Sequence, residues 1–201
     1  MLSEILFFKR QVKQLDARYA VFFVLCCFVP VVIATAIRNY SDVLFHIILI
    51  GSGWATWTYI EYFVHRFALH TKKEGERSVA SKKHQHHHHS PAVFEVNLFR
   101  RILLFVFCCL FFFLSWKWNN YFSLFAGFFW GAAAFCYIHY LLHQRWIKKV
   151  LPTHHYYHVC HHCKFPDKCF GVSVTWWDRL FDTTPPKDFT INNKVAAHYY
   201  L

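Results

Sequence analysis

The sequence predicts an all-α integral membrane protein, with four transmembrane helices arranged as two hairpins and a cytosolic, helical, histidine-rich cap. Three observations lead to this prediction. Four apolar runs are long enough, or nearly so, to cross a bilayer; short polar links join them in pairs; and most histidines lie beyond the ends of two runs. We expect residues 1–201 to form a single domain.

The composition separates this chain from soluble domains of similar length. Hydrophobic residues make up 56% of the 201 residues, and 24 residues are Phe. A soluble domain of this size could not bury so much aromatic surface, whereas lipid solvates it in a membrane protein. The formal net charge of +11 also suggests nucleic acid, but the positive charges fall between apolar runs and do not form one polar face. We therefore expect no nucleic-acid partner.

The four expected transmembrane helices are residues 20–37, 43–63, 102–118 and 121–142. A helix of about 20 residues rises about 30 Å, which matches the hydrocarbon core of a bilayer. The third run is short, and we expect Trp116 and Trp118 to extend it as an interfacial belt. The links at 38–42 and 117–120 are short, so each pair of runs is predicted to form a helical hairpin.

The distribution of Lys and Arg predicts the orientation of the chain. Arg38 and Lys117 lie on the side of the hairpin turns, whereas the other 20 of the 22 lie before residue 20, within 64–101, or after 143. Because cationic segments stay in the cytosol, we expect both termini and the segments 64–101 and 143–201 there. We expect no cleavable signal at the N-terminus. The protein is then multi-pass, in the endoplasmic reticulum of a eukaryote or the inner membrane of a bacterium.

Histidine is concentrated where the second and fourth runs reach the cytosol. Of the 16 histidines, 14 lie at or beyond these ends, and His46 and His198 are the exceptions. The candidate ligands form four clusters: His65 and His70; His84, His87 and His88; His139 and His143; and His158, His161 and His162.

The spacing within these clusters has a geometric meaning. Residues three or four apart share a helix face, so HxxxH and HxxHH are each expected to aim their imidazoles in one direction. His65 and His70 are five apart, about 140° around an ideal helix, and we expect them to straddle a bend at the helix end. Since the second and fourth runs end on the same side, all four clusters are predicted to converge there.

The number of histidines favours two metal ions. Imidazole suits zinc, copper, iron and nickel, so the ligand type alone does not identify the metal. Ten histidines shared by two ions give about five each, more than the four ligands of structural zinc, and leave an open position on an octahedral ion. We therefore expect two iron ions, which zinc could replace in a purified sample. The CHHC at 160–163 resembles a zinc motif, but four ligands so close in sequence cannot all reach one ion.

These motifs resemble the fatty acid hydroxylase/sterol desaturase superfamily of membrane di-iron enzymes, and its fatty acid 2-hydroxylase branch most. The first cluster has the branch's HxxxxH spacing, where sterol branches more often have HxxxH. The likeness runs from about Trp57 to Thr183. The remaining matches are Glu61-Tyr62 before the first cluster, Pro91 three residues after His88, the HYxxH at His139, and FGVSVTWWDRLFDT at 170–183, which resembles FG(V/I)xxxxWDxxFxT.

The sequence also departs from the branch at several positions. Gln85 replaces a usual Gly, and Gln144 follows His143 where a further His is common. Additional histidines leave the ligand register open within His84–His89 and within His154–His162. No fused cytochrome b5 domain is expected, so the electron donor would be a separate protein.

The resemblance implies O2-dependent hydroxylation of a lipid acyl chain at a di-iron site, with the ten clustered histidines as metal ligands and no further catalytic residue. The first expectation is 2-hydroxylation of a fatty acid or a sphingolipid N-acyl chain, with electrons from NAD(P)H passing through cytochrome b5 and its reductase or through a ferredoxin. Alternatives are a sterol C4-methyl oxidase, a C5-desaturase or a carotenoid hydroxylase of the same superfamily. A membrane metal carrier is the non-enzyme alternative.

The lipid is expected to enter laterally from the cytosolic leaflet, along a path lined by residues of the second and fourth runs. Four aromatic residues are candidates for this path or for ordinary packing: Trp54, Trp57, Tyr59 and Phe135.

Overall fold

The computed structural model describes residues 43–70, 78–91, 98–186, 189–190, 192 and 199–200. These residues form helices and connecting loops, without a strand among them. The all-α prediction is therefore confirmed for this part of the chain. The expected first run, 20–37, lies outside the described residues, so the four spans, the two hairpins and the cytosolic position of the cap remain predictions.

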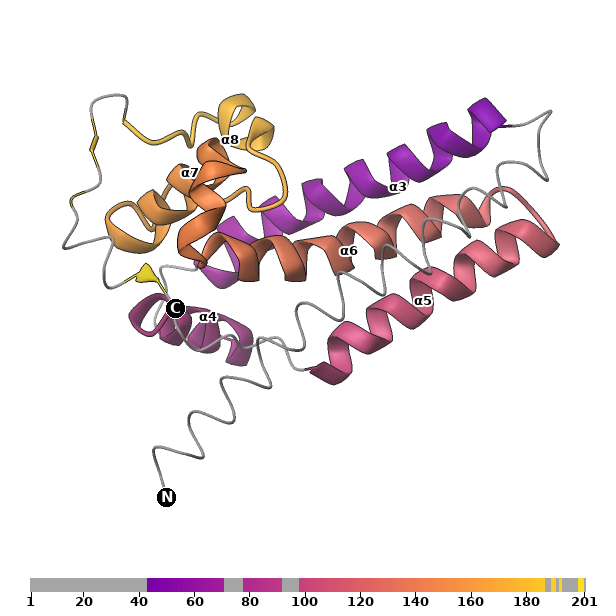
Figure 1. The fold of residues 1–201 in the computed structure, drawn as a ribbon, viewed down its shortest axis with the longest axis horizontal. Coiled ribbons are helices and arrows are strands. Elements are labelled where there is room, and N and C mark those ends of the chain that lie inside the picture. Colours follow the sequence, from indigo (N-terminus) through magenta and orange to yellow (C-terminus); the bar gives the residue numbers. More distant parts are fainter. Residues whose placement is uncertain are drawn as a thin grey trace, which may run out of the picture.

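Three long helices form the body of the molecule: α3 (Val43–Phe63), α5 (Leu98–Lys117) and α6 (Phe122–Leu142). α6 runs between α3 and α5, and packs against both (Figure 1). Within the described residues, these three helices are long and apolar enough to cross a membrane, and they mark the chain as a membrane protein. Many of their apolar side chains are exposed, among them Leu44, Ile47 and Ile48 on α3 and Ile102, Val106 and Phe113 on α5.

Small side chains allow the long helices to approach closely. A Cβ atom at Gly127 of α6 would overlap the backbone of Ile50 on α3, so only glycine fits at this crossing. On its other side, α6 buries Ala126 against Cys108 and Phe112 of α5. The close contact fixes α3 beside α6, so the ends of these two helices stay together.

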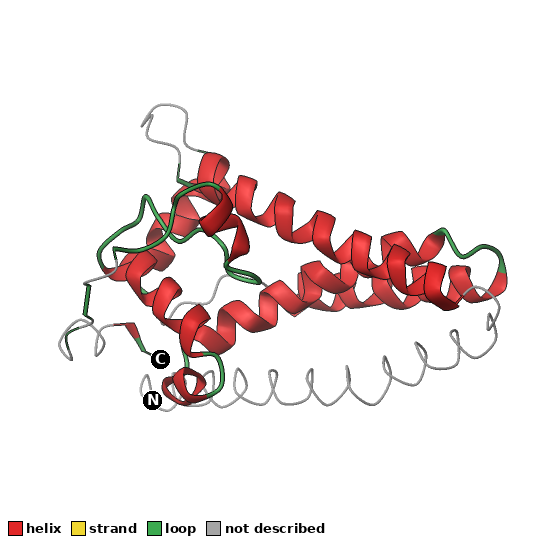
Figure 2. Ribbon diagram, turned by 90° about the horizontal axis from the view of Figure 1, so that it is seen from above, coloured by secondary structure: helices red, strands yellow, loops and turns green. Residues whose placement is uncertain are grey.

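The remaining helices gather at one end of the long helices (Figures 1 and 2). The π-helix η3 (Val64–Leu69) continues α3, and the cap contains α4 (Val79–His89), the short 3₁₀ helix η5 (Arg145–Lys149), α7 (Pro152–Cys163) and α8 (Trp176–Leu180). Ser78 caps α4 by accepting a hydrogen bond from the Ser81 amide (3.1 Å). The Ser81 hydroxyl donates to the Leu69 carbonyl (2.8 Å) and ties α4 to the end of η3.

The segment after α7 folds back onto the end of α3. Glu61 Oε1 accepts hydrogen bonds from the amides of Val172 (2.8 Å) and Ser173 (2.9 Å). The Trp177 indole donates to Thr58 Oγ1 (3.1 Å). These bonds join residues more than 100 positions apart in the sequence and hold the C-terminal loop over the helix end.

Candidate metal centre

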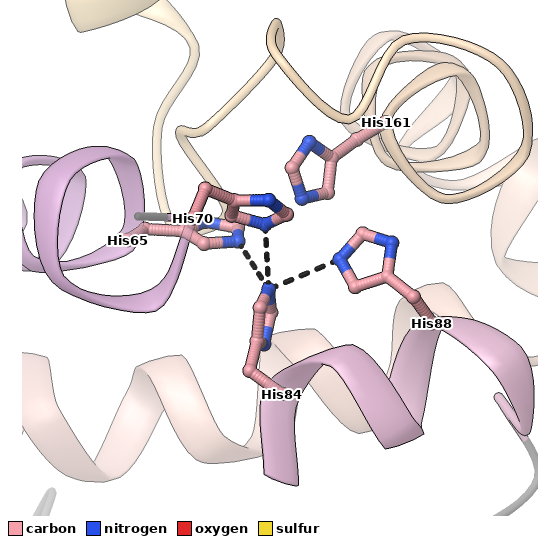
Figure 3. A group of neighbouring side chains, drawn as sticks. All are labelled: His65, His70, His84, His88 and His161. Carbon is pink, nitrogen blue, oxygen red and sulfur yellow. Dashed lines mark hydrogen bonds between the residues drawn. The ribbon is translucent and has the colours of Figure 1, made fainter. Parts of the chain in front are cut away.

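Nine of the ten candidate ligands lie in two adjacent groups at the end of α3 and α6, and the tenth lies beside one of them. Group A consists of His65, His70, His84, His88 and His161 (Figure 3). Group B consists of His87, His139, His143 and His162. Within each group the ligand nitrogens lie within 4.8 Å of one another. His158 lies beside group B, with its Nε2 3.2 Å from Nε2 of His143.

The two groups touch one another. The ring of His88 in group A stacks on the ring of His162 in group B, with centroids 4.2 Å apart and planes at 10°. His87 and His88 are also consecutive residues of α4 that belong to different groups. The arrangement is therefore one site with two neighbouring halves.

The expectation that each HxxHH aims all its imidazoles in one direction is wrong. On α4, His84 and His88 belong to group A, whereas His87 belongs to group B. α7 shows the reverse division, since His161 belongs to group A while His162 lies in group B, next to His158. Consecutive residues on an α-helix are 100° apart, so the two final histidines of each motif diverge. Each motif thereby contributes to both halves.

The expected bend between His65 and His70 is also replaced by a different structure. Residues Val64–Leu69 form a π-helix, in which hydrogen bonds join residues five apart. The His70 amide donates to the His65 carbonyl (3.2 Å), and the two rings lie with centroids 5.1 Å apart. The widened turn brings both histidines to one side, although an ideal α-helix would separate them.

Backbone carbonyls fix the protonation of three ligands. His65 Nδ1 lies 2.6 Å from the Phe170 carbonyl oxygen, and His161 Nδ1 lies 2.6 Å from that of Lys168. His143 Nδ1 makes a longer contact of 3.4 Å with the Tyr199 carbonyl. A carbonyl oxygen only accepts, so each Nδ1 carries the proton and each neutral ring keeps a lone pair on Nε2. Hydrogen bonds of this kind orient metal-binding histidines.

The nitrogens of group A are too crowded to be satisfied by their own protons. His84 Nε2 lies 2.9 Å from Nε2 of His65, 2.8 Å from that of His70 and 3.0 Å from that of His88 (Figure 3). A neutral imidazole carries one N–H, so it cannot bridge three neighbours. Among the described residues, His161 Nε2 and both ring nitrogens of His162 are buried without a hydrogen-bond partner. A cation bound within each group would satisfy the lone pairs of that group, so the residues fit a metal centre.

Burial keeps the ligands outside the long helices neutral. Burial lowers the pKa of His70 to about 4, and burial together with the neighbouring His87 lowers the pKa of His143 to about 3. Burial also holds the pKa of His158, His161 and His162 well below the ordinary value. Neutral imidazole is the form that binds metal, so no proton has to be displaced near neutral pH.

The donor set consists of nitrogen alone. Neither group includes a carboxylate or a thiolate. Nitrogens about 2.1 Å from one ion lie at most about 4 Å apart, comparable to the spread within each group. Imidazole suits iron, zinc, copper and nickel. The site can thus hold two transition-metal ions side by side.

The other described histidines lie outside both groups. His46 is buried near the far end of α3, where its Nδ1 lies 2.7 Å from Ser123 Oγ. His86 and His89 are exposed on α4, and His155 Nε2 contacts the Tyr200 hydroxyl (3.1 Å). His154 is half-buried and belongs to neither group, and His198 lies outside the described residues.

Sequence reasoning did not identify the residues that support the ligands. The carbonyl of Tyr199 orients His143, and the Tyr199 ring stacks on that histidine with centroids 4.6 Å apart. Nothing in the sequence marks a backbone carbonyl as a partner of histidine. Asp178 belongs to the 170–183 motif, so the sequence carried a signal, but its hydrogen bond from the Phe170 amide (2.8 Å) forms only in the folded loop.

The four aromatic candidates pack in different places. Phe135 lies against His139 of group B, with ring centroids 5.7 Å apart, and also contacts Trp57 (6.1 Å). Trp54 packs on Trp176, and Tyr59 packs on Trp177. Of the four, Phe135 contacts a candidate ligand directly, and Trp57 is joined to that ligand through Phe135.

Comparisons with known proteins match this arrangement. The ceramide very long chain fatty acid hydroxylase SCS7 of Saccharomyces cerevisiae is 29% identical over 169 residues, covering 77% of this chain and 43% of that protein. The fatty acid 2-hydroxylase of Rattus norvegicus is 30% identical over 167 residues, covering 77% of this chain and 45% of that protein. This chain thus spans less than half the length of these relatives.

A solved structure extends the likeness to three dimensions. The structure described as full-length scs7p, with only the hydroxylase domain visible, superposes with a TM-score of 0.56 at 26% identity, covering 85% of this chain and 68% of that one. The fatty acid hydroxylase family profile matches residues 50–183, which contain all ten clustered histidines. The chain belongs to the fatty acid hydroxylase family.

Proposed function

We propose that this protein is a membrane di-iron monooxygenase that hydroxylates a lipid acyl chain, at C2 of a fatty acid or of a sphingolipid N-acyl group. The observation that carries the proposal is the pair of touching histidine groups at the end of apolar helices. The names of the relatives, which include a fatty acid 2-hydroxylase and a ceramide fatty acid hydroxylase, support the substrate class.

The chemistry requires two metal ions that change oxidation state, and zinc does not. Bound iron would supply the activation of O2, with two electrons from NAD(P)H through a separate carrier such as cytochrome b5 or a ferredoxin. The ten histidines would hold the ions, with group A around one and group B with His158 around the other. Their neutral rings would hold the ions without offsetting the metal charge.

The surroundings of the site favour an apolar substrate. Phe135 borders group B at His139, Trp57 packs on Phe135, and neither side chain presents a charge to an incoming chain. An acyl chain that approaches group B beside Phe135 would place one methylene near the histidines. The protein's contribution is to hold that carbon in position and exclude water. We further propose that this end of the molecule faces the cytosol, in the endoplasmic reticulum or a bacterial inner membrane.

Expression in a host whose lipids lack 2-hydroxy acyl chains tests the proposal. Cells producing the native chain should accumulate 2-hydroxy acyl lipids, measured by mass spectrometry after hydrolysis. His88→Ala removes a group A nitrogen and should abolish the product. His89→Ala is the matched control, because this neighbouring histidine is exposed and belongs to neither group.

Two results would contradict the proposal. One is an acyl profile identical to that of the empty vector in cells that contain the folded native chain. The other is equal product from the native chain and His88→Ala. Accumulation of an oxidised sterol or carotenoid instead would keep the di-iron chemistry and reject the acyl substrate.

A further inference from the structure

Two ligands of group A are oriented by one short stretch of backbone. His161 Nδ1 donates to the carbonyl of Lys168, and His65 Nδ1 donates to the carbonyl of Phe170, both at 2.6 Å. These carbonyls are two residues apart, with Cys169 between them. The histidines come from different helices, η3 and α7, so the stretch fixes their relative position. We call Lys168–Phe170 the carbonyl clamp.

The backbone of the clamp adopts a rare conformation. Cys169 has φ of 58°, in the left-handed region that few non-glycine residues occupy, and its side chain is buried. Such a conformation persists only where the surrounding structure enforces it. The Cys169 amide donates to the Thr183 carbonyl (2.8 Å), which supplies part of that constraint.

Asp178 supplies a further part of the constraint. Its Oδ1 accepts hydrogen bonds from the Phe170 amide (2.8 Å) and the Thr183 hydroxyl (2.7 Å), and its Oδ2 accepts one from the Gly171 amide (2.9 Å). A Cβ atom at Gly171 would collide with the carbonyl of Val174 and crowd Oδ2 of Asp178, so the loop closes on this carboxylate only with glycine there. Asp178 is fully buried.

On these contacts we propose that Asp178 is a positioning residue for group A alone: it holds the carbonyl clamp, and the clamp fixes the tautomers and ring orientations of His65 and His161. The inference rests on the proposed metal centre. Asp178 itself touches neither histidine, and its influence passes through the Phe170 peptide. Group B has a separate support, since His143 donates to the carbonyl of Tyr199.

Cobalt(II) binding tests this inference, because its visible absorption reports the ligand geometry of each ion. The native protein should bind two Co²⁺ per chain, resolved by competition with a chelator. Asp178→Asn puts an amide N–H where the carboxylate now accepts a backbone hydrogen bond, and should weaken one Co²⁺ site about 10- to 100-fold and change its spectrum. The second site should keep its affinity and spectrum. Asp167→Asn is the matched control, an exposed carboxylate two residues before Cys169.

Thr183 provides a milder pair of variants if Asp178→Asn does not fold. Thr183→Val removes the hydroxyl that donates to Asp178 and should weaken the same Co²⁺ site by a smaller factor. Thr183→Ser keeps the hydroxyl and should restore the affinity and the spectrum. Rescue by serine separates a positioning role from a general loss of stability.

The outcomes distinguish this inference from the proposed function. A native chain that binds no Co²⁺ would overturn both. The positioning role would be overturned if Asp178→Asn left both Co²⁺ sites unchanged. It would also be overturned if each of the two variants, Asp178→Asn and Thr183→Val, weakened both Co²⁺ sites to the same extent. Either result would leave the metal centre standing.

Discussion

Group A and group B are built to the same plan from different supports. With His158 counted in group B, each group contains two histidines from the end of a long helix. Group A takes two further ligands from α4 and one from α7, and group B takes one from α4 and two from α7. Group A is oriented by a loop, through the carbonyls of Lys168 and Phe170. Group B has His139 on α6 and His143 at the C-cap of that helix, whose packing between α3 and α5 makes it part of the rigid body of the molecule.

The two groups also differ in how deeply their histidines are buried. Three ligands of group A, His70, His84 and His88, are partly exposed, whereas in group B only His162 is partly exposed. A site that depends on a loop and lies nearer the surface opens at a lower free energy than one inside a helix bundle. We therefore expect group A to exchange its metal faster than group B.

The largest expected effect comes from two adjacent residues of α7. His161→Ala removes a nitrogen from group A, and His162→Ala removes one from group B. Both should abolish hydroxylation, and each should reduce the bound metal from two ions toward one. Because different halves are lost, the remaining Co²⁺ spectra should differ between the variants. Identical spectra would show that the two groups do not bind separate ions.

Acidification should destabilise the metal-free protein through both groups. Burial lowers the pKa of His70 to about 4, and the pKa of His143 to about 3 with His87 adding to the effect, whereas histidine in an unfolded chain titrates near 6.5. Between these values the unfolded chain binds more protons, so stability falls as the pH falls from about 6.5. The buried His143 alone contributes a loss of about 1 kcal/mol per pH unit.

Thermal unfolding of the metal-free protein between pH 7.5 and 5 measures this effect. His143→Gln should reduce the slope of stability against pH, while His86→Gln on the exposed side of α4 should leave it unchanged. A melting temperature that is equally high at pH 5 and pH 7.5 would contradict the neutral, buried state of these rings.

The smallest effect concerns the support of group B. Tyr199→Phe removes the hydroxyl that donates to the Leu142 carbonyl (2.9 Å) and keeps the ring that stacks on His143. We expect a loss of about 1 kcal/mol of stability and a weakening of the group B metal site by up to about 10-fold. Group A should be unaffected in chelator titrations. A selective weakening of group A would reverse the assignment of supports.

The sequence was sufficient where one physical rule decided the outcome. Hydropathy and length located the helices that the structure places at Val43–Phe63, Leu98–Lys117 and Phe122–Leu142. Histidine spacing beyond the helix ends selected ten residues that lie together. His46 was set aside because it lies away from those ends, and in the structure it contacts Ser123 near the opposite end of α3. The expectation of convergence needed only that the two helices end on the same side.

The sequence was insufficient where the outcome depends on three-dimensional neighbours. The division of each HxxHH between two groups follows from where α4 and α7 lie relative to one another, which no local pattern specifies. The choice of His87 rather than the exposed His86 or His89 depends on the same placement. Backbone carbonyls that accept a hydrogen bond from a ligand, such as that of Phe170, cannot be identified from the sequence, because every residue carries the same peptide group.

The π-helix at Val64–Leu69 has a consequence for how motif spacing changes between related proteins. A turn of this type can be regarded as an α-helical turn with one inserted residue. Deleting that residue would return the turn to ordinary geometry and convert HxxxxH to HxxxH, and the two imidazoles would still meet on one face. The helix end can therefore absorb a change in chain length without loss of the metal centre, so either spacing is compatible with the same constellation of ligands.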